Sequence, residues 1–130
     1  MAITYIPSVE GIGSFGDYSP VSISGDLVVV AGQFGTDGVD AESQIRGSFA
    51  NVGKALAAAG LGFEDVIKFQ TFVVGRETIA PFMSTRKEVF GEIYPDGIYP
   101  PNTLLIVAGL VEERFVVEIE ALARRRDAEE

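Results

Sequence analysis

Residues 21–33 read Val-Ser-Ile-Ser-Gly-Asp-Leu-Val-Val-Val-Ala-Gly-Gln, and this stretch decides the fold. Residues 21–24 alternate between apolar and polar side chains and end at Gly25-Asp26, and the apolar run 27–31 follows at once. Two β-rich runs around a Gly-Asp pair are typical of a hairpin. Because the second run is apolar on both faces, we expect it to be a central strand of a sheet.

Outside this hairpin, strand and helix patterns alternate along the chain. Apolar residues at spacings of three and four predict a helix over about residues 42–59, which Gly60 would end. A second such stripe follows Thr78, a candidate N-cap, and stops before the turn cluster 94–97. The predicted strands are residues 3–6, 21–24, 27–31, 66–74, 102–107 and 115–122.

The predicted order β-β-β-α-β-α-β-β indicates a single α+β domain over residues 1–130, with one sheet covered on one face by two helices. Two helices leave the other face of the sheet bare, with Val and Leu exposed on it. An apolar patch of that size usually marks a partner surface. The mean hydropathy of +0.25 supports this interpretation. The pattern therefore predicts a homo-oligomer that buries these sheet faces.

The composition excludes several kinds of chemistry, because the 130 residues contain no Cys, His or Trp. A disulfide, a Cys nucleophile, a Ser-His-Asp triad and a thiolate or imidazole metal site are all impossible. The 10 Lys and Arg residues against 19 Asp and Glu give a net charge of −9, which disfavours nucleic acid as a partner. The one basic run, residues 124–126, is expected to be a solvated tail. No signal segment or membrane span is apparent, so we expect a cytoplasmic protein that does not bind membranes.

The residues that could do chemistry lie in the last strand and in two loops. Glu118 and Glu120 are two residues apart, so both side chains project from one face of a strand. A buried carboxylate pair would have a raised pKa and could act in acid–base catalysis; the alternative is that this face is simply exposed. Tyr18 could present its phenol to a cleft, although packing is the commoner role. The string Gly-x-Gly-x-x-Gly at 11–16 precedes a strand rather than a helix, which excludes a dinucleotide site.

Several segments, taken together in order and spacing, resemble the Rid family, the reactive intermediate deaminases also called YjgF proteins. The resemblance covers about residues 14–126, and the ordered set is more specific than any single motif. The matching segments are Gly16-Asp17-Tyr18-Ser19-Pro20, the run 25–33, Asn51-Val52, Ala59-Gly60-Leu61, Asp65-Val66-Ile67-Lys68, Pro100-Pro101-Asn102-Thr103 and the run 117–123.

The resemblance implies a chorismate-mutase-like fold and a homotrimer with ligand clefts between subunits. It also implies hydrolysis of reactive imines and enamines, such as 2-aminoacrylate, to a ketoacid and ammonia. The family uses no cofactor and no metal. An arginine holds the substrate carboxylate, and a glutamate, a tyrosine and backbone groups position the attacking water.

Matched position by position, Tyr18 and Glu118 fall on the catalytic tyrosine and glutamate of the family. Gly32 matches the glycine at the end of the strand motif, and Ala31 stands where many members have serine. Asn102, followed by Thr103, stands where the deaminating members carry arginine. The predicted substrate-binding residues are therefore Asn102, Gly32, Ala31 and Thr103. Glu120 falls on a second acidic position with no assigned role.

Replacing arginine by asparagine removes a full charge and a bidentate fork for a carboxylate. The resemblance thus predicts a hydrolase for a small imine or enamine with altered specificity. Two alternatives stay open: a non-catalytic small-molecule binder or regulator of the same fold, and another reaction in the same cleft, such as an isomerisation or a cyclisation. Arg76, Arg86 or Arg114 could supply a replacement charge, but the sequence does not place any of them in the cleft.

Overall fold

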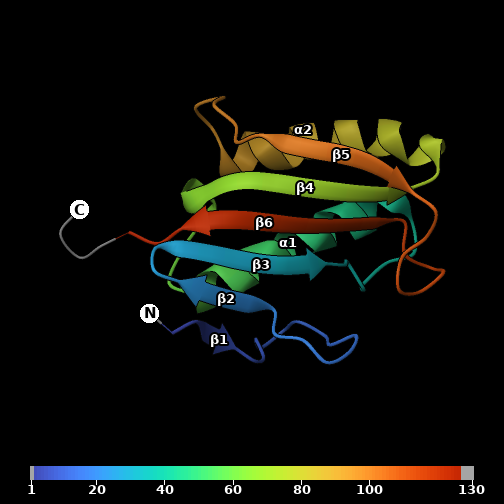
Figure 1. Ribbon diagram of the computed structural model, residues 1–130. Coiled ribbons are helices and arrows are strands. Elements are labelled where there is room, and N and C mark those ends of the chain that lie inside the picture. The colour runs from blue at the N-terminus through green and yellow to red at the C-terminus, as the bar shows by residue number, and fades with distance from the viewer. Residues whose placement is uncertain (1, 127–130) are drawn as a thin grey trace.

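The computed structural model describes residues 2–126, which form a layer of six strands and a layer of two helices (Figure 1). The strands are β1 (Thr4–Ile6), β2 (Val21–Ser24), β3 (Leu27–Gln33), β4 (Val66–Val74), β5 (Asn102–Val107) and β6 (Val117–Arg124). The helices are α1 (Ala41–Ala58) and α2 (Ile79–Ile93), and short 3-10 turns lie at Phe63–Asp65 and Arg76–Thr78. The predicted element order is confirmed.

The sheet has the strand order β1-β2-β3-β6-β4-β5. Neighbouring strands are antiparallel except β4 and β5, which run parallel on either side of the α2 crossover, so the sheet is mixed. The hairpin at Gly25-Asp26 pairs β2 with β3 as predicted, and β3 lies inside the sheet between β2 and β6. The α+β architecture with two helices on one face is confirmed.

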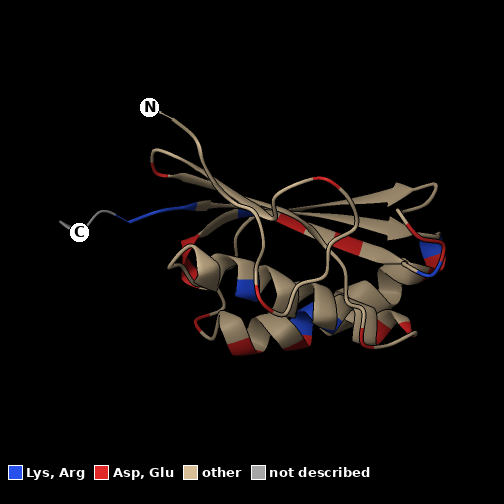
Figure 2. Cartoon of the chain, turned by 90° about the horizontal axis from the view of Figure 1, so that it is seen from below, with Lys and Arg blue, Asp and Glu red and all other residues tan. Residues whose placement is uncertain are grey.

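Both helices pack on the same face of the sheet, as Figure 2 shows from below. The core between the layers is rich in aromatic rings. The ring centroid of Phe49 in α1 lies 5.6 Å from that of Phe69 in β4 and 5.5 Å from that of Phe90 in α2. Alternate residues of β4, among them Phe69, Thr71 and Val73, point into this core. The remaining residues of the strand therefore face the other side of the sheet.

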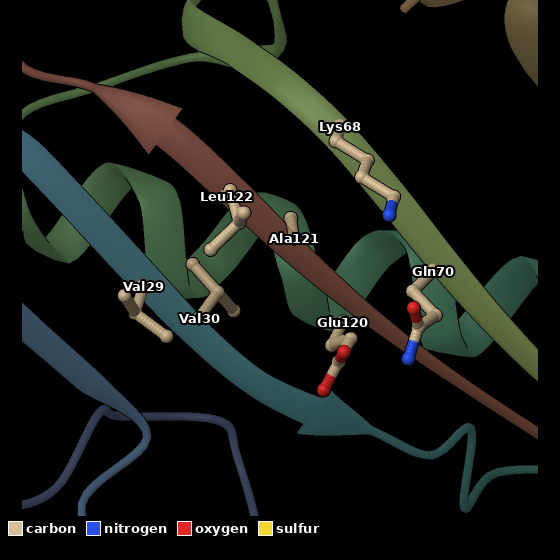
Figure 3. A pocket seen from close by; sticks show the side chains of 7 residues that line it. All are labelled: Val29, Val30, Lys68, Gln70, Glu120, Ala121 and Leu122. Atoms are coloured by element: carbon tan, nitrogen blue, oxygen red, sulfur yellow. The ribbon is translucent and has the colours of Figure 1, made fainter. Parts of the chain in front are cut away.

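The face opposite the helices is open and largely apolar. Val29, Leu122 and Leu105 on it are 37%, 38% and 42% exposed, as the strand patterns predicted. Polar side chains interrupt this face, among them Glu120 of β6, which lines a shallow cavity of about 110 Å³ between β3 and β4 (Figure 3). Lys68 of β4 also lines this cavity.

The ladder between β3 and β6 is irregular near one end. Val30 pairs with Ala121, but the next registered pair is Gln33 with Ile119, so Ala31 and Gly32 lie in a β-bulge. Bulges redirect side chains and commonly lie beside functional sites. This one brings the end of β3 against Glu118.

Three sequence predictions need correction. Thr78 occupies the N-cap position of α2 as predicted, but its side chain makes no capping hydrogen bond, because its hydroxyl donates to the carbonyl oxygen of Val74 at 2.6 Å. The last strand begins at Val117 rather than at residue 115, since the Phe115 ring stacks on Phe34 with centroids 4.4 Å apart. The basic run 124–126 is not simply a solvated tail: Arg126 Nε lies 2.8 Å from Oδ1 of Asp65, whose side chain is only 5% exposed.

Candidate functional site

Four of the predicted site residues line one cavity on the open side of the sheet. Tyr18, Ala31, Gly32 and Glu118 meet there around a volume of about 250 Å³. The cavity lies at the bulged end of β3, where β6 begins. Its remaining walls are apolar and consist of Phe15, Phe34 and Val111.

The Glu118 carboxyl is partly buried in this cavity. Burial, with a smaller contribution from the negative charge of Glu120, raises the pKa of Glu118 above its ordinary value of 4.5. The predicted pairing of the two carboxylates on one face is therefore present, and the alternative of a fully exposed face does not hold for Glu118. A carboxyl with a raised pKa is a stronger base once ionised, so it is better suited to take a proton from water and return it.

Gly32 leaves the space that the Glu118 carboxyl occupies. A Cβ atom at residue 32 would overlap the carboxylate oxygen Oε2 and the Cδ and Cγ atoms of Glu118. Glycine is required here by close approach rather than by an unusual backbone angle. The bulge and the glycine together allow the carboxyl to lie directly against the β3 backbone.

Tyr18 is carried by the loop between β1 and β2 and is 46% exposed. The loop is fixed to the sheet by Phe15, whose ring makes edge contacts with Phe34 at 5.2 Å and Phe115 at 5.4 Å. Such edge-to-face pairs add about 0.5–1.5 kcal/mol beyond the area they bury. The aromatic cluster thus holds the tyrosine loop at the mouth of the cavity.

Polar side chains on α1 fix the backbone beneath the cavity. Asn51 donates to the carbonyl oxygen of Phe34 at 2.7 Å, and the hydroxyl of Ser48 accepts from the Gly35 N–H at 3.1 Å. Gln44 donates to the Arg114 carbonyl oxygen and accepts from the Val116 N–H, both at 2.9 Å. These buried amide and hydroxyl groups tie the end of β3 and the start of β6 to one helix.

Asn102 lies in a different place, at the start of β5 on the helix side of the sheet. Its Oδ1 accepts from the buried Thr71 hydroxyl at 3.0 Å, and its Nδ2 is buried with no partner among the described residues. It lines a cavity of about 490 Å³ between α2 and the segment before β5, together with Met83, Arg86, Lys87, Phe90, Tyr99 and Pro100. Within one chain, Asn102 and Glu118 are therefore on opposite faces of the sheet.

Thr103 is exposed on the open side of the sheet and pairs with Gln70 of β4. It lines neither of the two cavities just described. The six predicted residues are thus divided: Glu118 and three others line the first cavity, Asn102 lies in the second cavity, and Thr103 lies at the edge of the open face.

The structure shows which aromatic and arginine side chains line the two cavities, and the sequence alone did not place them. Phe34 lines the Glu118 cavity, while Phe90 and Tyr99 line the Asn102 cavity. Of the three candidate arginines, Arg86 lines the Asn102 cavity, whereas Arg114 is paired with Glu112 at 2.6 Å. The α1 amides at Gln44 and Asn51 carried a signal that was overlooked: polar residues within an apolar helical stripe usually hold neighbouring backbone.

The donor groups do not suggest a metal site. Among residues 2–126, no group of three or more Asp and Glu side chains is placed to hold a metal ion. In the same part of the chain, no helix has the length and apolar character needed to cross a membrane.

The fold and the carboxyl cavity define a class of protein: an α+β domain whose sheet has a partly buried glutamate at a bulge beside a tyrosine loop. A family model described as Endoribonuclease L-PSP matches residues 10–125. The chain belongs to this family, which is the Rid or YjgF family.

Similar proteins agree with this assignment. The RutC family protein YjgH of Escherichia coli is 37% identical over 112 residues, covering 82% of each chain. The 2-iminobutanoate/2-iminopropanoate deaminase of Salmonella typhimurium is 32% identical over 108 residues, covering 78% of this chain and 82% of its own. The crystal structure of E. coli TdcF with bound serine superposes with a TM-score of 0.83 at 29% identity, covering 95% of this chain and 99% of that one.

Proposed function

We propose that this protein hydrolyses the C=N bond of a small imine, or of the imine tautomer of a small enamine, with Glu118 and Tyr18 as its catalytic residues. The observation that carries the proposal is the Glu118 carboxyl, partly buried with a raised pKa in a cavity that Tyr18 and Gly32 also line. The similarity to a protein named 2-iminobutanoate/2-iminopropanoate deaminase supports the same reaction class. The substrate is expected to differ from that protein's because Asn102 stands where the family resemblance expects arginine.

In this mechanism, the oxygen of a water molecule bonds to the imine carbon, and the electron pair of the C=N bond moves to nitrogen. Glu118 takes one proton from the water and returns it to the nitrogen, and Tyr18 orients the water by hydrogen bonding. Glu118 then takes the remaining hydroxyl proton and passes it to the amine, which leaves as ammonia as the C=O bond forms, so an imine and water give an oxo compound and ammonia. Such general acid–base assistance typically contributes about 10²–10⁴-fold to the rate.

We also propose that the working site lies between two subunits of a homotrimer. Glu118 and Asn102 are on opposite faces of the sheet, so one chain cannot bring both to one substrate. Two copies can do so if the cavity with Glu118 of one subunit faces the cavity with Asn102 of its neighbour. The open sheet face, with Val29, Leu105 and Leu122 exposed, offers the apolar surface that such an assembly would bury.

Sedimentation equilibrium should therefore give a mass about three times that of one 13.9 kDa chain. A Leu105→Glu substitution, placed on the open face opposite Phe72, should dissociate the assembly because it would bury an unpaired charge. Val39→Glu is the matched control, since Val39 is 94% exposed in the loop before α1. A monomeric wild-type protein would contradict the intersubunit site.

The hydrolase proposal is tested by Asn102→Arg, assayed with 2-aminoacrylate and 2-iminopropanoate. Charge-assisted hydrogen bonds are worth about 1.5–3 kcal/mol, so kcat/KM for these short acids should rise by about ten- to a hundredfold. The same change leaves the Thr71 hydroxyl without its acceptor, so some stability should be lost. Asn102→Met is the control, because it also removes the acceptor but adds no charge.

If neither the wild type nor Asn102→Arg hydrolyses any imine, the alternative function gains: a non-catalytic small-molecule binder or regulator that uses the same cavity. The name of the family model also suggests RNA cleavage. The net charge of −9 opposes that function, since phosphate backbones are repelled by an acidic surface.

A further inference from the structure

The cavity beside Asn102 contains a cation whose own charge partner is absent. The guanidinium of Arg86 projects from α2, with Nη2 donating to the Met83 sulfur at 3.1 Å and Cζ lying 5.1 Å from the centre of the Phe82 ring. Among residues 2–126, no carboxylate lies within ion-pairing distance of Arg86. In a chain with 19 acidic and 10 basic residues, a partly buried arginine without a carboxylate is unexpected.

The environment of Arg86 increases its affinity for an anion. A thioether sulfur is a weak acceptor, so most of the five guanidinium N–H donors have no strong acceptor from the described chain. Burial lowers the pKa of Arg86, which stays protonated, and this is the sign of incomplete solvation of the charge. An incoming carboxylate would supply the negative charge and the hydrogen-bond acceptors that the Arg86 guanidinium lacks.

Other groups in the cavity indicate the chemistry and size of the rest of the ligand. The walls from Phe90, Tyr99 and Met83 are apolar, and the Phe90 and Tyr99 ring centroids are 5.4 Å apart. Lys87 adds a second positive charge at the same cavity. The volume of about 490 Å³ lies within the range of small-molecule sites and exceeds what a two- or three-carbon acid fills.

We infer that this cavity binds an organic carboxylate with an aromatic or bulky apolar side chain, and that Arg86 holds the carboxylate in place of the arginine absent at Asn102. The inference builds on the proposed function, because it names the substrate class for the same intersubunit site. Arg86 lies on α2, whereas an arginine at residue 102 would lie on β5. The carboxylate would therefore bind at a different point in the cavity, and this position favours longer acids. Asn102 Nδ2, buried and unpartnered, is then available to a ligand oxygen after a small rotation of the amide.

Binding is measured by calorimetry on the intact protein with two inert probes, 3-phenylpropanoate and the neutral 3-phenylpropanamide. The wild type should bind the carboxylate about ten- to a hundredfold more tightly than the amide. Arg86→Gln should remove this preference while leaving amide binding unchanged, and Arg86→Lys should keep part of it. A purely structural arginine would change affinity for both probes alike.

Arg76→Gln is the matched control, since Arg76 is an exposed arginine in the turn before α2 that does not line the cavity. It changes the net charge equally and should leave the preference intact. Loss of the preference in Arg76→Gln, or its persistence in Arg86→Gln, overturns the inference.

The outcome is separable from that of the hydrolase proposal. Glu118→Gln should lower turnover of imines by about 10²–10⁴-fold yet keep the carboxylate preference, because the Arg86 guanidinium that holds the carboxylate is unchanged. If the wild type hydrolyses imines but binds both probes equally, the inference about Arg86 fails and the hydrolase stands. If the preference depends on Arg86 but no imine is hydrolysed, the binding site stands without the hydrolase.

Discussion

Replacing Glu118 by Gln should lower kcat/KM for imine hydrolysis by about 10²–10⁴-fold, because the amide cannot take a proton from the attacking water. The substitution keeps the shape of the side chain and its place against Gly32. Steady-state ammonia release, measured beside wild type, gives the effect. A variant that retains more than a tenth of the wild-type rate would contradict the role of Glu118 as the base.

The same Glu118→Gln variant should lose activity but gain stability at neutral pH. The pKa of Glu118 is raised in the folded state, so the folded protein binds this proton more tightly than the unfolded chain does. Ionisation of Glu118 therefore lowers the free energy of unfolding as the pH rises from about 4.5 through the raised pKa. Above that pKa the full destabilisation is present. Glu118→Gln removes this cost, so its melting temperature at neutral pH should exceed that of the wild type, with the difference vanishing in acid.

A Glu120→Gln variant distinguishes the role of Glu120 from that of Glu118. The charge of Glu120 contributes to the raised pKa of Glu118, so its removal should move the acidic limb of the pH–rate profile to lower pH. The limb reports the carboxylate form of Glu118, which is the form that accepts a proton. An unchanged limb would mean that another group controls the pH dependence.

The second large effect is expected from Gly32→Ala. The new methyl group would occupy the position of the Glu118 carboxyl, which must swing away because it is the more flexible partner. Activity should therefore fall nearly as far as in Glu118→Gln, by about 10²-fold or more, since small displacements of a catalytic group are costly. The loss should appear mainly in kcat.

Gly91→Ala is the matched control for this experiment. Gly91 lies within α2 with nothing near its would-be Cβ atom, so alanine there should stabilise the helix by about 0.5–1 kcal/mol and leave activity unchanged. Thermal unfolding and ammonia release are measured on both variants. A Gly32→Ala protein with wild-type activity would show that the bulge does not position the carboxyl.

Local patterns in the sequence were sufficient for most of the fold. The alternation at 21–24, the apolar run after Gly25-Asp26 and the period change at about residue 42 each depend on neighbours a few residues apart. The element ends were less predictable. Phe115 looked like strand but stacks on Phe34, and Thr78 looked like a cap but bonds back to Val74, because partners distant or earlier in the chain compete for these side chains.

The grouping of the site residues depended on different information. The two-residue spacing of Glu118 and Glu120 was enough to put both carboxylates on one face, since strand side chains alternate. That the tyrosine loop reaches Glu118, and that Asn102 does not, follows from long-range pairing: β5 pairs with β4, and Asn102 turns toward Thr71 on the helix side. No local pattern contains this information.

By itself, the sequence determined the order of elements, the bare sheet face and the absence of any Cys or His chemistry, because these follow from residue types and short-range periodicity. The tertiary structure alone decided that Gly32 makes room for Glu118, that Arg86 rather than Arg114 lies beside Asn102, and that Glu118 and Asn102 lie on opposite faces. These facts depend on register, a bulge and the packing of a crossover helix, which bring together residues far apart in the chain.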